Sequence, residues 1–574
     1  MRRSILASLA ATLAACAAAP PVKPSITGDQ MKDDYVITGN LLTPEGWAAA
    51  ALVRGGRFAC VGTIADCAAQ GRPGAPVLDL GKGYAVPGLV DAHGHVFGYG
   101  RSLLEVRCDG TGDEEECADR VADRAREMPR GSWIRGRGWN QEDWPASQLP
   151  SERTLTEAVP EHPVLLMRAD GHAAWVNQAA LDAAGIDADT PDPEGGRILR
   201  YPDGRPSGVL VDNAVALVND KLGKPSPAEL EQGIERALRD LLSLGLTEVH
   251  DAGCDGDTLE AYRRLATTGR LPLRVYAMID GQQPLPELQR LMELWKKTPE
   301  VGRLTVRAVK LYADGALGSR GAVLSADYAD DPGNHGLWVT QPAELRARIE
   351  LVLRAGFQPA VHAIGDAANA EVLRDFAALA DAGLDLAPLR PRLEHAQLLP
   401  LAEIHVLKDH GCVASMQPIH AVQDASWVQK RLGADSPILA GAYAWKTVLR
   451  YGVPLAFGSD FPAESPDPRL GLRAAEERIP TGKRQPWQPE QRLTRLEALR
   501  AYTRGAAVAA LAEKRRGEIR VGYDADLTVF STDPLAVPAA DLPKLKVVRV
   551  LVGGKGEIGG DPITGSQPGG KAAF

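Results

Sequence analysis

The amino-acid sequence predicts an α/β protein built around a (β/α)8 TIM barrel. The first observation is a set of eight apolar segments of strand length, most of them separated by segments with helical periodicity. The second is that histidine, lysine and carboxylate residues stand where several of these segments end, which is where such barrels carry their sites. The third is a strand-rich segment at each end of the chain, too short to form a stable sheet alone. We therefore expect a composite β-sandwich from both chain ends and an inserted α+β domain after strand one.

Length and composition are those of a globular protein with more than one domain. The chain has 574 residues, of which 44% are hydrophobic and 24% are charged. The net charge at pH 7 is −9 and no basic patch stands out, so we expect no nucleic-acid partner.

The N-terminus has the pattern of an export signal. Two arginines precede a short apolar segment at residues 5–15, which is too short to span a membrane. This segment ends in Leu-Ala-Ala-Cys, which resembles a bacterial lipobox and implies cleavage before Cys16 with lipid on its thiol. An ordinary secretory signal cut near Ala19 is the alternative. We expect an exported protein of the periplasm or cell envelope that touches the membrane through this lipid anchor alone.

Export also bears on the cysteines. The pairs Cys60–Cys67 and Cys108–Cys117 are close in sequence, so either can form a local disulfide in an oxidising compartment. Cys254 and Cys412 stand in apolar, strand-like contexts and are predicted to be buried free thiols.

The two ends of the chain predict one shared β-domain. Residues 35–39 and 51–61 have the pattern of short strands with a Gly-Gly turn, and residues 517–530 and 547–552 show the same strand-like pattern. Combining them into one small domain, with the large middle of the chain inserted, is the economical solution.

The middle of the chain divides into an insertion and a barrel. Residues 97–224 are rich in Gly, Pro, Asp and Arg and predict a long insertion with irregular structure. A helix follows, because Ser226 and Glu229 form a capping box before an apolar stripe that ends near Gly245. After the opening strand, which ends at residue 95, the barrel strands are predicted at 246–251, 273–279, 304–312, 357–362, 391–395, 412–416 and 453–460, with helices such as 343–354 and 367–382 between them.

The predicted domain limits follow from these segments. They are 1–15 (signal peptide), 16–33 (tether), 34–85 with 513–560 (β-sandwich), 86–96 with 225–512 (barrel) and 97–224 (inserted substrate or lid domain).

Polar residues at the strand ends predict a metal site. His93 and His95 are two apart, so on one strand both imidazoles point to the same side. Each candidate alone has another explanation: a strand-end histidine can be structural, Lys310 can snorkel, and Asp460 can cap a helix. Their occurrence together on five strands of one barrel favours metal binding. The candidates are His93, His95, Lys310, His362, His395 and Asp460.

Several longer motifs carry a family resemblance. They are VPGLVDAHGH, RGRGWNQEDW, the Asp170-Gly171-His172 segment with Trp175 and Asn177, VKLYADGALGSRGA, VHAIGDAAN, LEHAQ, MQPIH, FGSDFP and GYDADLTVF. Through them, nearly the whole chain after residue 33 resembles the amidohydrolase superfamily, in particular its YtcJ-like (amidohydrolase 3) branch. The resemblance implies the same layout of composite β-sandwich, metal-bearing barrel and inserted domain.

The resemblance also implies roles for the six candidates. One metal ion would be bound by His93, His95 and Asp460, the second by His362 and His395, with Lys310 bridging both as a carbamate formed with CO2. Imidazole and carboxylate ligands suit two zinc ions, and manganese, iron and nickel are alternatives. A metal-bound water would attack an amide carbonyl, and Asp460 would pass its proton to the leaving nitrogen.

Further residues are candidates for substrate contact at the barrel mouth. Each has a structural alternative, such as a hydrogen bond, a loop anchor or a place in the core. They are His172, Arg320, Tyr312, His420 and Trp139, with Trp144 beside the last. His250 ends strand two, where the family places no ligand, and is left out.

These expectations lead to a functional hypothesis. We expect a metal-dependent amidohydrolase that cleaves a non-peptide carbon–nitrogen bond of a small-molecule substrate, namely an N-substituted amide or an N-acyl or N-formyl amine. A deaminase or cyclic-amide hydrolase on the same barrel is one alternative, and a non-catalytic ligand-binding surface lipoprotein is another. No motif identifies the substrate, and the sequence leaves a homo-oligomer open.

Overall fold

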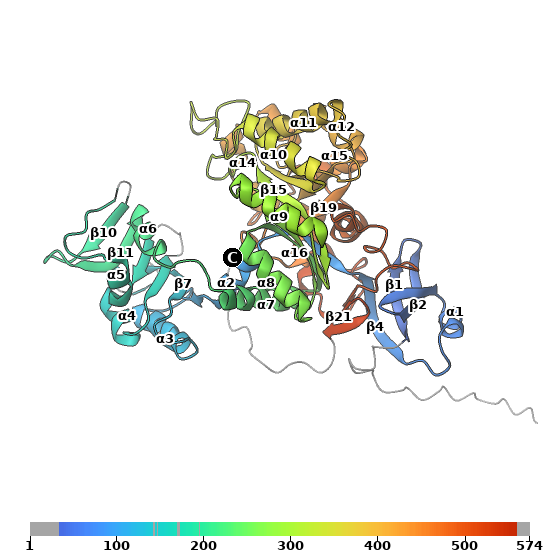
Figure 1. Cartoon of the computed structure of the whole chain (residues 1–574), viewed down its shortest axis with the longest axis horizontal. Coiled ribbons are helices and arrows are strands. Elements are labelled where there is room, and N and C mark those ends of the chain that lie inside the picture. The colour runs from blue at the N-terminus through green and yellow to red at the C-terminus, as the bar shows by residue number, and fades with distance from the viewer. Residues whose placement is uncertain (1–33, 142–143, 146, 169–172, 194–195, 559–574) are drawn as a thin grey trace, which may run out of the picture.

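The computed structural model describes residues 34–558, apart from 142–143, 146, 169–172 and 194–195. The predicted signal peptide, the tether with Cys16, and His172 lie outside the described residues. A barrel occupies the centre of the molecule, a sheet built from both chain ends lies on one side, and the insertion lies on the other (Figure 1). None of the described helices is long and apolar enough to cross a membrane.

Strands from both ends of the chain form one seven-stranded sheet in the order β22-β21-β20-β4-β1-β2-β3. The central strand β4 runs parallel to β1 and antiparallel to β20, so it joins the N-terminal strands to the C-terminal ones. A disulfide, Cys60–Cys67, ties β3 to the short helix α1. The elements are β1 (Tyr35–Thr43), β2 (Gly46–Arg54), β3 (Arg57–Gly62), α1 (Ile64–Gln70), β4 (Val77–Pro87), β20 (Leu527–Phe530), β21 (Val547–Val552) and β22 (Lys555–Ile558).

Eight parallel strands of the described chain form the predicted barrel. A parallel bridge between Gly94 and Phe461 connects the first strand to the segment after the last and closes the barrel. In chain order the strands are β5 (Leu89–Gly94), β12 (Leu246–Cys254), β13 (Arg274–Asp280), β15 (Leu304–Tyr312), β16 (Gln358–Ala363), β17 (Arg392–His395), β18 (Val413–Met416) and β19 (Leu455–Phe457), with β14 (Glu300–Val301) added antiparallel to β15.

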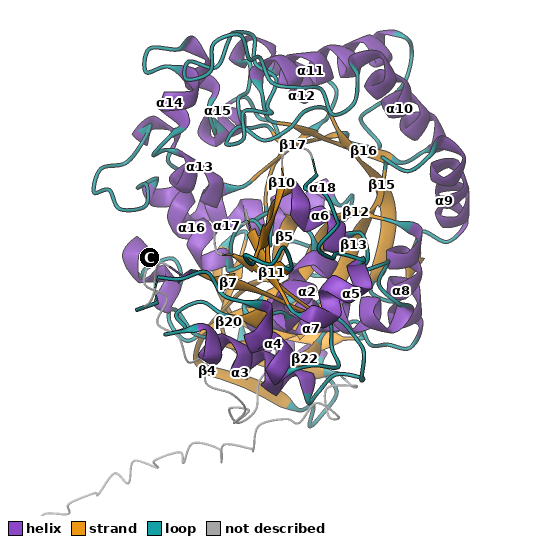
Figure 2. Cartoon of the chain, turned by 90° about the vertical axis from the view of Figure 1, so that its left-hand side faces the viewer, coloured by secondary structure: helices purple, strands orange, loops and turns teal. Residues whose placement is uncertain are grey.

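Helices surround this barrel on the outside (Figure 2). They are α2 (Val96–Leu104), α7 (Pro227–Ser243), α8 (Gly256–Thr267), α9 (Leu285–Lys297), α10 (Pro342–Ala355), α11 (Asp366–Asp381), α12 (His405–Asp409), α13 (Pro418–Asp424), α14 (Val428–Leu432), α15 (Trp445–Arg450), α16 (Pro468–Glu477), α17 (Arg495–Arg500), a π-helical turn (Ala501–Gly505) and α18 (Ala506–Ala509).

The predicted (β/α)8 class is confirmed, and local signals place many of its elements. The capping box at Ser226 and Glu229 begins α7 as expected. The strand predicted at 453–460 is shorter, ending at Phe457, because the next three residues leave the ladder and Asp460 adopts a positive φ of 61°.

The insertion is more regular than expected. It contains a six-stranded mixed sheet in the order β10-β11-β9-β8-β7-β6, so the prediction of irregular structure is wrong. Its glycine and proline residues lie between elements that are individually short. The elements are β6 (Val106–Arg107), α3 (Glu114–Ala125), β7 (Ile134–Trp139), α4 (Glu152–Ala158), β8 (Val164–Arg168), β9 (Ala173–Val176), α5 (Gln178–Ala184), β10 (Gly196–Arg200), β11 (Pro206–Asp212) and α6 (Ala216–Asn219).

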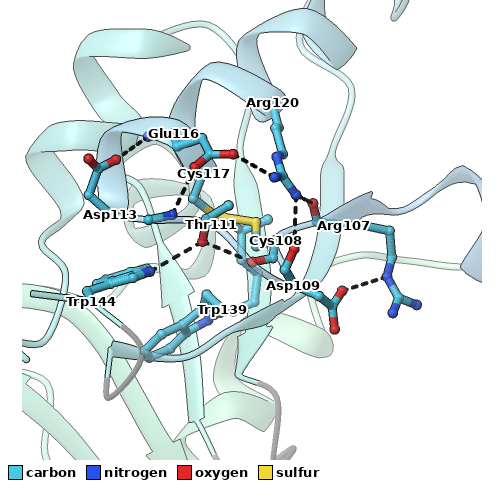
Figure 3. Close-up of a disulfide and its surroundings, with 12 residues drawn as sticks. Arg107, Cys108, Asp109, Thr111, Asp113, Glu116, Cys117, Arg120, Trp139 and Trp144 are labelled. Carbon is cyan, nitrogen blue, oxygen red and sulfur yellow. Dashed lines mark hydrogen bonds and ion pairs between the residues drawn. A yellow bond between two sulfur atoms is a disulfide. The ribbon is translucent and has the colours of Figure 1, made fainter. Parts of the chain in front are cut away.

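One edge of the insertion is held by the second predicted disulfide. Cys108 after β6 is bonded to Cys117 in α3, and both sulfurs are buried in the insertion's core (Figure 3). Beside it Thr111 donates to the Cys108 carbonyl, and the Trp144 indole donates to Thr111 Oγ1 at 3.3 Å. Cys254 and Cys412 are buried free thiols, as expected.

Candidate metal centre

The six predicted ligands meet at the carboxyl ends of five barrel strands. His93 is the fifth residue of β5, Lys310 lies in β15, His362 in β16 and His395 at the end of β17. The first and last strands are tied together where they end. The amide of Asp460 donates to the His93 carbonyl at 2.7 Å, and the amide of His95 donates to the Phe461 carbonyl at 2.8 Å. Barrel closure therefore places residues 367 positions apart, His93 and Asp460, beside each other.

The first predicted group lies within coordination range. Nε2 of His95 is 3.2 Å and Nε2 of His93 is 3.6 Å from Oδ1 of Asp460. These three donor atoms lie close enough to share one metal ion. His93 is fully buried, while the side chain of His95 is 39% exposed and that of Asp460 17% exposed. The group thus has a buried side and a side open to solvent.

The second predicted group is a pair of facing imidazoles. The ring centroids of His362 and His395 are 4.5 Å apart, and those of His93 and His395 are 4.7 Å apart. Nε2 of His362 is buried without a hydrogen-bond partner among the described residues. An unpaired imidazole nitrogen inside a protein is costly, and a metal ion is a partner that would satisfy it.

Lys310 lies between the two groups. Its side chain is 1% exposed, and Nζ donates to Nε2 of His93 at 3.0 Å and lies 5.1 Å from the centroid of the Tyr312 ring. Burial lowers the pKa of Lys310 to about 8. Burial, and then the neighbouring Lys310, lower the pKa of His93 to about 4 and that of His362 to about 3. Both imidazoles are therefore neutral at neutral pH, which is the form that binds metals.

Two charged residues behind the site were missing from the predicted set. Nδ1 of His93 donates to Oε2 of Glu394 at 2.5 Å, and Oε1 of Glu394 lies 2.6 Å from Nε of Arg392. Burial alone would raise the pKa of Glu394, but Arg392 and His93 hold it well below its usual range. A carboxylate on Nδ1 fixes the tautomer that leaves Nε2 free for a metal. Arg392 and Glu394 are two residues apart on β17, so their side chains lie on the same face of the strand. This spacing is the signal in the sequence that could have predicted their pairing.

His395 has an equivalent partner. Its Nδ1 donates to Oε1 of Gln417 at 2.9 Å, which again leaves Nε2 directed to the site. Asp91 accepts hydrogen bonds from the amide and hydroxyl of Ser459 and so joins the first and last strands behind the centre. Asp314 accepts from the amides of Val323, Ile364 and Gly365, holding the loop after β15 against β16.

Two of the mouth candidates lie at the site. The ring of Tyr312 is 5.8 Å from that of His362, and the ring of His420 stacks on His395 at 6.1 Å. Nε2 of His420 is 3.9 Å from Oδ2 of Asp460, and His395, His420 and Asp460 form a second group of donors able to share an ion. His420 is therefore a candidate ligand as well as a candidate for substrate contact.

Arg320 and Trp139, the other described mouth candidates, have structural partners. Arg320 is engaged by both carboxylate oxygens of Asp330, which also pairs with Arg431, so it holds its own loop. Trp139 is completely buried in the insertion's core, where its indole donates to the Leu166 carbonyl and its ring packs on Trp144 and Trp175. The prediction that Trp139 and Trp144 wall the pocket is wrong, because the insertion needs these rings for its own core. His172 lies outside the described residues.

His250, which we left out of the ligand candidates, has charged partners of its own. Its Nδ1 lies 3.0 Å from Arg392 and its Nε2 lies 3.7 Å from Glu248, inside the barrel. The residues that remain at the strand ends offer imidazole nitrogens and carboxylate oxygens, partly buried and with outer partners that orient them. This donor set fits zinc and related divalent ions.

Comparisons with known proteins agree with this geometry. A model of the amidohydrolase family matches residues 76–556. The putative amidohydrolase YtcJ of Bacillus subtilis (strain 168) is 33% identical over 496 residues, covering 84% of this chain and 91% of the relative. N-substituted formamide deformylase of Arthrobacter pascens is 29% identical over 554 residues, covering 92% and 98%. The structure of an uncharacterized metal-dependent hydrolase from Pyrococcus horikoshii OT3 superposes with a TM-score of 0.73 at 25% identity, covering 88% and 99%.

The family model spans most of the chain, including every strand of the barrel and all six predicted ligands. The relatives are matched over nearly their whole length, so the likeness extends beyond the barrel. The chain belongs to the amidohydrolase family and is a metal-dependent hydrolase that acts on carbon–nitrogen bonds other than peptide bonds.

Proposed function

We propose that this enzyme hydrolyses an N-substituted amide, or an N-acyl or N-formyl amine, of a small-molecule substrate. The observation that carries the proposal is the convergence of six metal-capable side chains, from five strands, on a site with one open side. The name of the Arthrobacter relative, a deformylase of N-substituted formamides, supports the substrate class.

We infer that the centre holds two divalent ions, zinc by preference, with manganese, iron and nickel as alternatives. His93, His95 and Asp460 would hold one ion, and His362 and His395 the other. When bound, such ions lower the pKa of water to roughly 7 and polarise a carbonyl group. Glu394 and Gln417 keep the Nε2 atoms of His93 and His395 directed at the ions.

Lys310 is proposed to join the two groups as a carbamate. Its Nζ lies in the interior beside His93, and no carboxylate is within hydrogen-bond distance of it among the described residues. Attack of the neutral amine on CO2, with loss of one proton, gives an anion with two oxygens. That anion supplies the negative charge that a buried pair of divalent ions requires.

Asp460 is proposed to move the proton of the reaction. Its carboxylate lies between His95 and His420 and is partly open to solvent, so it can face both the attacking water and the leaving nitrogen. It would accept the water proton and then donate it to that nitrogen, as base and then acid. Tyr312 and His420 are placed to contact the substrate.

A panel assay with the purified chain tests this function. The chain is loaded with Zn2+ or Mn2+ in bicarbonate buffer and given N-formyl amines, N-acyl amines, amino-acid amides and lactams, and the release of amine is measured. We expect turnover of at least one N-acyl or N-formyl amine, and its near abolition in Asp460→Asn with metal content unchanged. A metal-loaded chain that cleaves nothing in the panel would refute the proposal, and an active Asp460→Asn would refute the proton role alone.

We also propose that the protein is exported and anchored to the cell envelope through lipid on Cys16. The signal pattern of the first residues and the two local disulfides support export. Membrane fractionation of cells that make the parent chain or Cys16→Ser checks the anchor. The parent should sediment with membranes and the variant should not, and an equal distribution would contradict it.

A further inference from the structure

A cavity of about 280 Å3 lies where the insertion joins the barrel, and none of its lining residues belongs to the metal centre. Its walls come from helices α2 and α7 of the barrel, from α3 and β7 of the insertion, and from residues 222–225 between the two parts. Figure 1 shows α2 and β7 meeting at this boundary. We call this space the junction cavity.

The junction cavity carries an excess of positive charge. Its lining cations are Arg101, Arg124, Arg135 and Lys224, and its lining carboxylates are Glu105 and Glu229. Glu229 is occupied by the capping box of α7, where it accepts from the amide of Ser226 at 2.7 Å. Arg124 is paired with Glu127 at 2.9 Å.

The remaining lining carboxylate, Glu105, lies between two arginines and makes no hydrogen bond to the Nε atom of either. Its Oε1 lies 3.8 Å from Nε of Arg135 and 4.0 Å from Nε of Arg101, beyond hydrogen-bond distance in both cases. Nε of Arg135 is buried and has no hydrogen-bond partner among the described residues. Burial, and then the charge of Arg101, lower the pKa of Arg135. A buried Nε–H without a hydrogen-bond partner, on a guanidinium beside a second cation, is unfavourable, and a bound anion would accept that hydrogen bond and offset the positive charge.

The remaining walls are mainly hydrocarbon. They include Phe97, Leu104, Met128, Trp133, Ile134 and Leu222. A small inorganic anion would leave these surfaces without a partner, whereas a molecule with an apolar body would cover them.

We propose that the junction cavity binds a small amphipathic anion, with its charged head held by Arg101, Arg135 and Lys224 and its apolar body against the hydrocarbon walls. A medium-chain carboxylate is the simplest molecule of this class. The cavity adjoins both chain connections between insertion and barrel, at residue 105 and at residues 222–225, so an anion bound to Arg101 of the barrel and Arg135 of the insertion would tie the two parts together.

Isothermal titration of the full chain with octanoate, 1-octanol and octylammonium tests the proposal. Octanoate should bind at one site, and the neutral and cationic analogues at least about tenfold more weakly. Arg135→Met and the exposed Lys224→Met should each weaken octanoate binding about tenfold, which is about 1.4 kcal/mol. Arg130→Met is the matched control, because Arg130 lies on the same insertion, is 78% exposed and pairs with Glu161 outside the cavity.

Two further measurements keep the result interpretable. Circular dichroism melting of each variant checks that it is folded, and repetition after EDTA treatment separates the junction cavity from the metal centre. Binding that survives EDTA and falls in both cavity variants supports the proposal. Equal binding of 1-octanol, parental affinity in both Arg135→Met and Lys224→Met, or loss of binding with the metal would overturn it.

Discussion

Replacing Glu394 by glutamine removes one negative charge from the barrel interior and keeps the size of the side chain. In the native protein this carboxylate faces two partners at once, Nδ1 of His93 at 2.5 Å and Nε of Arg392 at 2.6 Å, and all three side chains are fully buried. A glutamine amide can present its oxygen to only one of them and must turn its NH2 group toward the other. The substitution therefore leaves either the imidazole or the guanidinium facing a donor.

Two separate losses follow, each with its own magnitude. Arg392 becomes a buried cation without its counter-ion, and breaking such a pair costs about 3–5 kcal/mol of folding free energy. His93 loses the partner that selects its tautomer, and loss of such an outer-sphere carboxylate weakens metal binding about 10–100-fold. Guanidinium unfolding of the metal-free chain measures the first loss, and zinc competition with a chelator measures the second.

A matched control separates these effects from the mere loss of a carboxylate. Glu513 makes a two-oxygen ion pair with Arg390, away from the metal centre, so Glu513→Gln should leave zinc affinity within about twofold of the parent. A Glu394→Gln chain that binds zinc with parental affinity and unfolds at the parental denaturant concentration would refute the assigned role of Glu394.

Other parts of the fold give further predictions. Removing the Cys108–Cys117 disulfide opens a loop with a sequence separation of 9, and the chain-entropy relation gives a loss of about 2.6 kcal/mol of stability. Tryptophan fluorescence should then show the insertion unfolding at a lower denaturant concentration. An unchanged unfolding midpoint would contradict this prediction. Trp139→Ala should cost about 3–5 kcal/mol in the insertion with little change in zinc affinity, and loss of zinc binding with intact stability would instead restore Trp139 to the site. Burial alone would raise the pKa of Glu248, but Arg516 lowers it from its ordinary 4.5 to about 2. The Glu248 carboxylate therefore contributes about 3 kcal/mol of folding stability above pH 4.5, and this contribution is lost as the pH falls toward 2. In Arg516→Met the Glu248 carboxylate is buried without this arginine, so its protonated form is favoured in the folded chain. Urea unfolding should therefore show that the variant gains stability, relative to the parent, as the pH falls from 7 to 4. The same pH dependence in both chains would refute this account.

The positions of the barrel elements were predictable because their signals are local. The strand predicted at 304–312 has the same limits as β15, since a strand buried on both faces is apolar almost throughout. The grouping of the candidate ligands was predictable for a related reason. The two-residue period of a strand places His93 and His95 on one side, and the barrel brings the strand ends together whichever side chains lie between them.

Partner choice across long sequence distances was not predictable. The guanidinium of Arg320 could bind either a substrate or Asp330. The fold of the loop after β15 places Asp330 beside it, so Arg320 pairs with Asp330. A tryptophan such as Trp139 can form a pocket wall or part of a core. The sheet of the insertion places Trp139 in the core.

The sequence by itself therefore determined the class of the barrel, the order of its strands and the candidate ligands at their ends, because these depend on periodicity and on residue type. The tertiary structure alone decided that Glu394 orients His93 from 301 residues away, and that Arg101 and Arg135 share the single carboxylate of Glu105 where the insertion joins the barrel. The physical reason is that burial and charge pairing are properties of a three-dimensional environment, and each involves chain segments that carry no local record of one another.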